Sequence, residues 1–160
     1  MVSLEQEVGE TLRYWGLTLG IVESATGGLI SHLITNIPGS SDYYKGSVTA
    51  YSNEVKIKIV GVKEDTIKKH GTVSHQVAEE MAEAGRRVLD VDICLSDTGI
   101  AGPGGAAAGK PVGLFYLGLS QKSGTYSRKL SFERSREENK LDAAKAALGW
   151  LKEYLLSLED

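Results

Sequence analysis

The 160-residue sequence has a single cysteine and three histidines. One cysteine cannot form an internal disulfide, and it is too few for a zinc site based on cysteine. His32, His70 and His75 fall in or beside expected helices and lack the spacing of metal ligands. We therefore expect no metal and no cofactor.

Long apolar runs and an excess of positive charge are also missing. No run approaches the ~20 apolar residues that span a bilayer, and residues 3–15 have the pattern of an amphipathic helix, not of a signal peptide. We therefore expect a cytoplasmic protein without a membrane partner. The formal net charge of -3 provides no field for a polyanion, so nucleic acid is not an expected partner.

The residues that are present follow the pattern of one α/β domain covering residues 1–160. No repeat or linker divides the chain, and strands mixed with helices favour a three-layer domain, with a mixed sheet and helices packed on both faces. Helices are predicted over residues 3–15, 29–37, 54–60, 64–70, 74–88 and 135–158. Strands are predicted over residues 17–22, 43–50 and 91–95 and, as a hairpin, over 112–119 and 126–132.

Three polar segments follow expected strands, at residues 23–28, 51–56 and 98–110. Ligands of open α/β sheets gather outside strand ends, so these segments could share one pocket. Ser24 stands where a helix begins, and the free N–H groups of a first helical turn suit an oxyanion or a phosphate. The alternative is that Ser24 or Thr26 only caps the helix.

A nucleophilic serine needs a base, and Lys56 is the candidate because no histidine is well placed. An unperturbed lysine has a pKa of about 10.4, and its neutralisation at pH 7 costs roughly 4.6 kcal/mol. Burial would have to lower that pKa, and desolvation can lower the pKa of a lysine by up to ~3–5 units. Spacing alone favours the interpretation of Lys56 as a solvated helix residue over that of a base.

Three motifs in the same order resemble one known family, the CinA (competence/damage-inducible) C-terminal domain family. The motifs are Glu23-Ser24-Ala25-Thr26-Gly27-Gly28, Ala50-Tyr51-Ser52-Asn53-Glu54-Val55-Lys56, and Gly99-Ile100-Ala101-Gly102-Pro103-Gly104-Gly105 with Lys110-Pro111-Val112-Gly113. The resemblance implies hydrolysis of the carboxamide of nicotinamide mononucleotide to nicotinate mononucleotide and ammonia, by a serine and a lysine without a metal. Family members are often homo-oligomers, and the same is expected here.

By position, the resemblance makes Ser24 the nucleophile, Lys56 its general base, and Tyr51 a residue that assists the proton transfer. The N–H groups of Thr26, Gly27 and Gly28 could hold the oxyanion. The candidates for binding the substrate phosphate are Thr98, Gly99, Ile100, Ala101, Gly102 and Arg136.

Some positions depart from the family pattern. Ala25 follows the serine where many relatives have cysteine, and Arg134-Ser135 replaces a Gly-Asp pair. A second basic position further along is Lys140.

Two alternatives remain, namely a nucleotide-binding or interaction module of the competence type without catalysis, and an amidase for another small phosphorylated amide.

Overall fold

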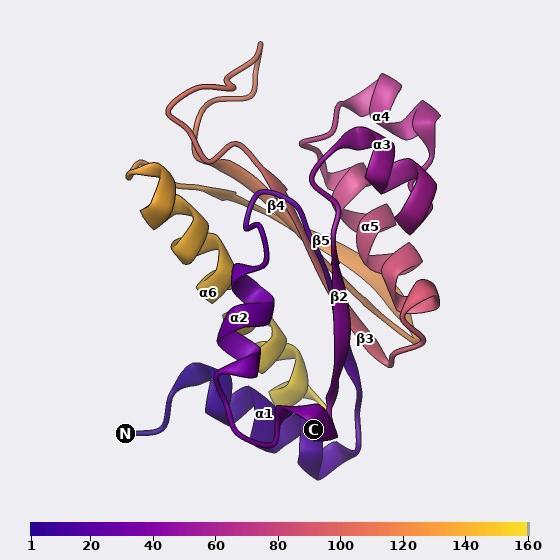
Figure 1. Cartoon of the computed structure of the whole chain (residues 1–160), viewed down its shortest axis with the longest axis vertical. Helices are drawn as coiled ribbons and strands as arrows, with labels where there is room; N and C mark the ends of the chain where they lie inside the picture. The colour runs from indigo at the N-terminus through magenta and orange to yellow at the C-terminus, as the bar shows by residue number, and fades with distance from the viewer. Residues whose placement is uncertain (160) are drawn as a thin grey trace.

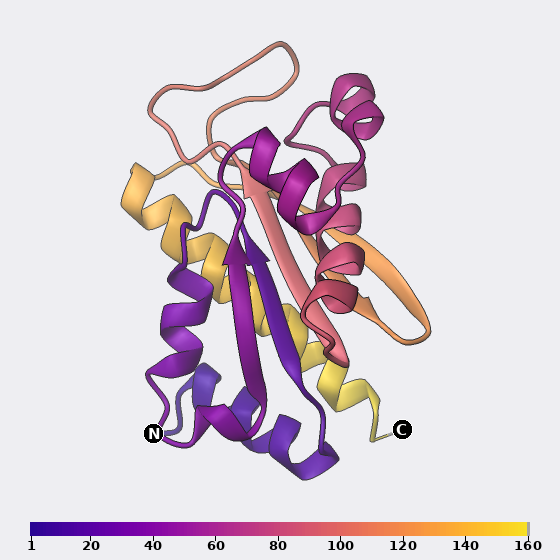
Figure 2. The same ribbon diagram turned by 45° about the vertical axis from the view of Figure 1, so that its right-hand side comes forward.

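A five-stranded mixed sheet divides the molecule into three layers (Figure 1, Figure 2). The computed structural model describes residues 1–159. The strand order is β2-β1-β3-β4-β5, with β1 parallel to β2 and β3 and with β4 antiparallel to both neighbours. The strands are β1 (Leu19–Glu23), β2 (Tyr44–Thr49), β3 (Ile93–Gly99), β4 (Leu114–Gln121) and β5 (Gly124–Ser131).

Helices cover both faces of this sheet, which confirms the predicted three-layer α/β class. One face carries α1 (Leu4–Trp15), α2 (Leu29–Thr35) and α6 (Arg136–Ser157). The other face carries α5 (His75–Val88) and three short elements, α3 (Asn53–Val55), the π-helical turn η2 (Lys56–Val60) and α4 (Glu64–His70). A short 3-10 turn, η1 (Ser40–Asp42), leads into β2.

The ends of the long helices follow local sequence signals. The Ser3 hydroxyl accepts the Gln6 N–H at 3.2 Å at the start of α1, and the Ser135 hydroxyl accepts the Glu138 N–H at 3.3 Å at the start of α6. Gly16 ends α1 with a φ of 66°, a left-handed conformation that glycine adopts without strain. These predicted helix ends are confirmed, whereas α2 ends at Thr35, two residues before its predicted end.

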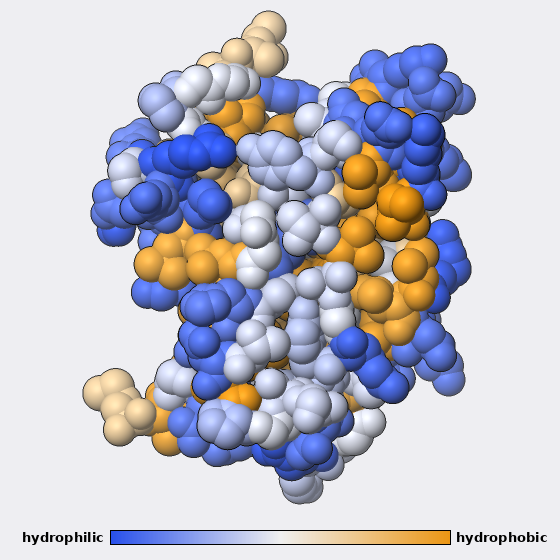
Figure 3. Space-filling model, in the orientation of Figure 1, coloured by the Kyte–Doolittle hydropathy of each residue, from blue (hydrophilic) through white to orange (hydrophobic). Residues whose placement is uncertain are grey.

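Each face of the sheet has its own apolar core. On one side Leu12, Ile34 and Leu148 pack together, and on the other side Val22 packs with Met81 of α5. Figure 3 shows a mostly hydrophilic face, with apolar side chains gathered over the side where α3, η2 and α5 lie. Within residues 1–159, no helix combines the length and the apolar character needed to span a bilayer.

The connections of β1 and β3 place a crevice at one edge of the sheet. The chain leaves β1 toward α2 on one face and enters β3 from α5 on the other. In parallel sheets such a reversal of connection opens a binding crevice at the carboxyl ends of the two strands. The segment predicted as a loop from Thr98 onward needs one correction, because Thr98 and Gly99 form the end of β3 and pair with β4.

Candidate active site

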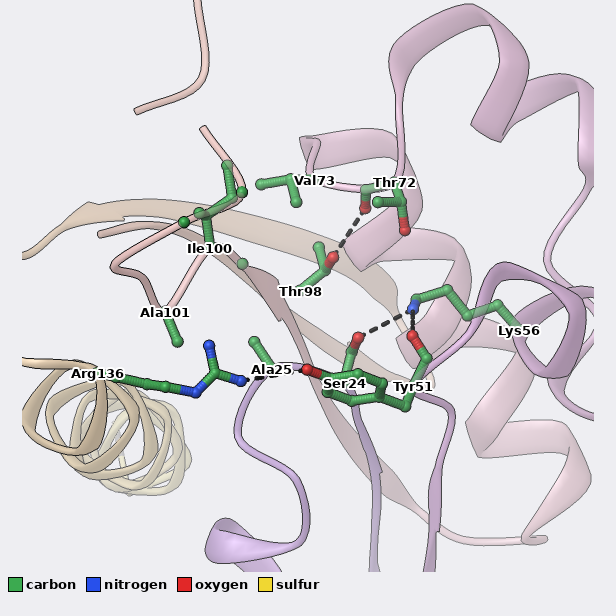
Figure 4. A pocket seen from close by; sticks show the side chains of 13 residues that line it. Ser24, Ala25, Tyr51, Lys56, Thr72, Val73, Thr98, Ile100, Ala101 and Arg136 are labelled. Carbon is green, nitrogen blue, oxygen red and sulfur yellow. Dashed lines mark hydrogen bonds between the residues drawn. The ribbon is translucent and has the colours of Figure 1, made fainter. Parts of the chain in front are cut away.

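Ser24 and Lys56 meet at the carboxyl end of β1. Ser24 follows the last residue of β1, and Lys56 is the first residue of η2. The Lys56 Nζ lies 2.9 Å from the Ser24 Oγ and 3.0 Å from the Tyr51 carbonyl oxygen (Figure 4). Ser24 is 7% exposed and Lys56 is 1% exposed. The structure therefore joins a hydroxyl and an amine that lie 32 residues apart in the chain.

The turn around Lys56 follows from a capped start and an irregular helix. The Ser52 hydroxyl accepts the Val55 N–H at 3.1 Å, which begins α3. The Lys56 carbonyl then accepts N–H groups from both Gly61 and Val62, at 3.0 and 2.9 Å. Such π-helical turns are rare and occur often at functional sites.

Burial changes the acid–base character of the Lys56 amine. Removal from water lowers the pKa of Lys56 from 10.5 to about 8, against the opposing effect of the negative charge of Asp97. At pH 7 the neutral fraction of such an amine is roughly a tenth, about 300 times that of a solvated lysine. The pKa of Lys56 is thus lowered by burial, which the sequence analysis named as the requirement for a lysine base.

The backbone carbonyl and the side-chain hydroxyl of Tyr51 bond to different residues of the site. The Tyr51 carbonyl accepts a hydrogen bond from Lys56, while its hydroxyl accepts one from Arg136 Nη2 at 3.3 Å. The Tyr51 side chain is exposed and lines the cavity, and within residues 1–159 its hydroxyl hydrogen-bonds to Arg136 and to neither Ser24 nor Lys56.

The predicted oxyanion donors are engaged elsewhere. The Thr26 N–H bonds to Asp97 Oδ1 at 3.0 Å, and the Gly27 N–H bonds to the Ser24 carbonyl at 3.0 Å. The Gly28 N–H bonds to Glu23 Oε1 at 3.2 Å. These three groups are therefore not free to hold an oxyanion, which corrects the interpretation from sequence.

The start of α2 is occupied by the protein itself. The Glu23 carboxylate accepts the N–H groups of Ile30 and Ser31, each at 2.9 Å, and the Ser31 hydroxyl at 2.6 Å. It therefore takes the place at this helix end that the sequence suggested for a substrate anion. Within residues 1–159, the Ala25 N–H, directly after Ser24, has no hydrogen-bond partner.

A cavity of about 270 Å³ opens in front of Ser24. Its walls come from the end of β1, the turn after β2, the segment before α5, the loop after β3 and the start of α6. The lining residues are Ser24, Ala25, Tyr51, Lys56, Thr72, Val73, Thr98, Gly99, Ile100, Ala101, Gly104, Gly105 and Arg136. Thus Thr98, Gly99, Ile100, Ala101 and Arg136 share a cavity with the Ser24–Lys56 pair.

Some of the predicted phosphate ligands are held by other protein groups. The Thr98 hydroxyl donates to the Thr72 carbonyl at 2.8 Å, and the Ile100 N–H bonds to the Leu114 carbonyl at 2.9 Å. Gly102 does not line the cavity, and its carbonyl accepts Arg136 Nη1 at 2.8 Å. Arg136 still has further N–H groups for a ligand, because a guanidinium carries five.

Arg134 and Lys140, which the sequence analysis noted among the departures from the family pattern, do not line this cavity. Arg134 forms ion pairs with Glu138 at 2.5 Å and with Asp142 at 3.3 Å. The Lys140 side chain lies near the turn after Ser24. If Gly27 carried a Cβ, that atom would be 3.6 Å from the Lys140 Nζ.

Sequence reasoning missed several residues that shape the site. Asp97 is fully buried and bonds to the N–H groups of Ser24 and Thr26. Asn139 is also fully buried, and its Nδ2 holds the Ala101 carbonyl at 3.0 Å. The sequence carried a signal for Asp97, because this acid lies two residues beyond the predicted apolar strand 91–95, and ionisable groups beside buried strands are costly and often functional. Within residues 1–159, no group of His, Cys, Asp and Glu side chains could hold a metal ion.

Comparison with known proteins identifies the family to which this chain is similar. The family model described as CinA C-terminal domain matches residues 1–155. A putative competence-damage inducible protein of Halothermothrix orenii is 50% identical over 96% of this chain and 37% of its own length. A CinA-like protein of Salinibacter ruber is 46% identical over 92% of this chain and 36% of its own length. The chain therefore spans less than two fifths of these relatives.

Solved structures share the whole fold. The competence damage-inducible protein A (ComA) of Klebsiella pneumoniae has a TM-score of 0.93 and 27% identity, covering 96% of this chain and 95% of that one. The competence/damage inducible protein CihA of Agrobacterium tumefaciens has a TM-score of 0.90 and 33% identity, covering 98% of this chain and 94% of that one. On these matches and on the motifs gathered around Ser24, this chain belongs to the CinA C-terminal domain family.

Proposed function

We propose that this protein is an amidohydrolase that converts nicotinamide mononucleotide to nicotinate mononucleotide and ammonia. The observation that carries the proposal is the buried contact of 2.9 Å between the Ser24 hydroxyl and the Lys56 amine, with the lysine pKa lowered to about 8. A serine beside a neutral lysine is a known variant of the activated nucleophile. The choice of substrate rests on the family resemblance of the three motifs.

The first chemical step is acylation of Ser24. Neutral Lys56 donates one N–H to the Tyr51 carbonyl, and this bond turns its lone pair toward the Ser24 hydroxyl. The Ser24 Oγ attacks the carboxamide carbon while its proton passes to the Lys56 Nζ. The tetrahedral intermediate then loses its C–N bond, and the Lys56 ammonium returns the proton to the departing nitrogen, which leaves as ammonia.

The second step is hydrolysis of the acyl-enzyme. Lys56, neutral again, takes a proton from a water that attacks the Ser24 ester. Collapse of that intermediate releases nicotinate mononucleotide and gives Ser24 back its proton. No metal takes part in either step of this proposal.

The oxyanion of both intermediates needs a donor, and Ala25 supplies the best placed one. Its N–H follows the nucleophile directly, belongs to a residue that lines the cavity, and has no partner within residues 1–159. A preorganised donor of this kind contributes about 10²–10³ in kcat.

Arg136 is the proposed phosphate ligand. It lies at the start of α6 across the cavity from Lys56, fixed by the Gly102 carbonyl and the Tyr51 hydroxyl (Figure 4). Two contacts orient the guanidinium and leave other N–H groups for phosphate oxygens. Binding at this remote end would favour a mononucleotide over free nicotinamide.

Ammonia release from nicotinamide mononucleotide by the purified protein tests the proposal. We expect turnover by the natural protein and none above background by Ser24→Ala. The surface control Lys58→Met should keep full turnover, because Lys58 is exposed although it lies only two residues from Lys56. Binding of the nucleotide without ammonia release would instead indicate a module without catalysis. Release from other phosphorylated amides alone would indicate a different amidase.

A further inference from the structure

Two buried carboxyl groups lie beneath the nucleophile, joined by one hydroxyl. Glu23 and Asp97 are both 0% exposed. The Thr26 hydroxyl is 2.6 Å from Glu23 Oε1 and also contacts Asp97 Oδ2. Within residues 1–159, neither carboxyl forms an ion pair with lysine, arginine or histidine. Two unpaired buried charges side by side are costly, so the protonation of this cluster needs a separate account.

Counting donors identifies where a proton is needed. A threonine hydroxyl carries one proton, so it donates to only one of its two carboxyl neighbours. The other contact needs a proton that belongs to the carboxyl group. The 2.6 Å contact between Thr26 Oγ1 and Glu23 Oε1 is within the range of an O–H···O⁻ hydrogen bond.

The other hydrogen bonds show which carboxyl carries this proton. Glu23 accepts four further donors, the N–H groups of Gly28, Ile30 and Ser31 and the Ser31 hydroxyl. Asp97 accepts only two further donors, the N–H groups of Ser24 and Thr26. The ionised form is therefore stabilised more at Glu23 than at Asp97.

We propose that Asp97 is a positioning residue whose carboxyl proton is shared through the Thr26 hydroxyl with Glu23. In this arrangement Asp97 Oδ2–H donates to Thr26 Oγ1, and Thr26 Oγ1–H donates to Glu23 Oε1. The cluster then holds one negative charge instead of two. The Ser24 and Thr26 N–H groups remain on Asp97, so the same carboxyl fixes the turn that carries the nucleophile.

The charged groups around Asp97 favour this assignment. Burial and the charge of Glu23 raise the pKa of Asp97 to about 6, although the hydrogen bonds donated by the Thr26 and Ser24 N–H groups oppose this shift. The negative charge of Asp97 raises the pKa of Lys56 in η2. On α6, Lys140 approaches the turn at Gly27, and on β4 the residue paired with Asp97 is the apolar Leu117.

The protonation states of Asp97 and Lys56 are coupled, and the effect of the Asp97 proton on the amine is greatest below about pH 6, where Asp97 is protonated. Negative charge on Asp97 raises the pKa of Lys56, so a proton on Asp97 keeps more of the amine neutral. This second part of the inference rests on the proposed function, whereas the shared proton does not. The two can therefore be tested separately.

Infrared spectroscopy of the natural protein tests the shared proton directly. A protonated carboxylic acid has its own carbonyl band, and labelling with [4-¹³C]aspartate shifts that band only if aspartate carries the proton. We expect an aspartate band at pH 5.5 that disappears with a midpoint near pH 6, where an ordinary aspartate titrates near 3.8. Absence of an aspartate band at pH 5.5 would overturn the proposal, whether or not the protein hydrolyses an amide.

Variants of the linking hydroxyl test its role in positioning. Thr26→Val keeps the shape and removes the bridge, and Thr26→Ser keeps the bridge. We expect Thr26→Val to lower the infrared midpoint or abolish the band and to reduce kcat at least tenfold with little change in KM, and Thr26→Ser to behave like the natural protein. Asp92→Asn, at an exposed aspartate bonded to Thr18, is the control for the band and should leave it unchanged.

Each outcome of these experiments bears on one proposal. An unchanged band and kcat in Thr26→Val would refute the shared proton. Ammonia release without the band would refute the inference alone, and the band without ammonia release would refute the proposed function alone.

Discussion

Replacing Lys56 by methionine should stabilise the protein at neutral pH while removing its base. The folded state lowers the pKa of Lys56 from 10.5 to about 8, so the folded protein binds this proton more weakly than the unfolded chain does. The contribution of Lys56 to stability is therefore most favourable above pH 10.5 and is lost as the pH falls from there through 8. Methionine fills a similar volume and carries no charge, so it is free of this penalty.

The pH-dependent part of the effect has a calculable size. With these two pKa values, Lys56 costs about 3 kcal/mol of unfolding free energy at pH 7 and about 1 kcal/mol at pH 10. Lost hydrogen bonds to Ser24 and Tyr51 and the packing of methionine add terms that change little with pH. The stability difference between Lys56→Met and the natural protein should therefore be about 2 kcal/mol more favourable at pH 7 than at pH 10.

Urea denaturation at the two pH values measures this difference. Lys58→Met is the matched control, because Lys58 lies in the same η2 turn, is exposed, and among residues 1–159 pairs only with the exposed Glu54 at 2.8 Å. Its effect should be below about 1 kcal/mol at either pH. If Lys56→Met shows the same small, pH-independent change as Lys58→Met, then Lys56 is not a buried amine of lowered pKa, and the reasoning about the base is wrong.

Four further outcomes are expected. Ser24→Ala should reduce ammonia release to background while changing the urea midpoint little, as activity and denaturation assays will show. The kcat/KM of the natural protein should rise with pH through about 8, as Lys56 loses its proton, and a flat profile between pH 6 and 9 would contradict its role as base. Arg136→Met should lower kcat/KM for nicotinamide mononucleotide at least tenfold but leave that for the nucleoside without phosphate nearly unchanged. Glu23→Gln should destabilise the fold by about 2–4 kcal/mol in denaturation experiments, because an amide group cannot accept all the N–H groups that the carboxylate holds.

Local signals in the sequence were enough for most elements. Ser3, Ser135 and Gly16 mark helix ends whose hydrogen bonds involve residues only three or four positions away, so the sequence contains both partners. The runs that became β1 and β4 were recognisable because they are almost wholly buried, and their residues are mostly apolar. The polar segments at strand ends made Ser24 a candidate nucleophile and Lys56 a candidate base, and the family resemblance then implied their roles and that of Tyr51.

Other predictions failed where a side chain reached across the fold. The free N–H groups at the start of α2 looked available in sequence, but Glu23 folds back onto them. Asp97 takes the Thr26 N–H from a neighbouring strand, 71 residues away. The Asp97 contact has no short-range signal, because the distance between its partners depends on how β1 and β3 pair, whereas the Glu23 contacts span only five to eight residues of the chain.

The amphipathic helices, their caps, the strands and the polar segments at strand ends could all be read from the order of the residues, since they depend on near neighbours and on apolar periodicity. The contact between a hydroxyl at the end of β1 and an amine of η2 could not, because it exists only once the chain has folded. The same holds for the withdrawal of that amine from water, because the packing of distant segments sets solvent exposure. Reactivity here depends on that exposure, and so on the folded arrangement of the whole chain.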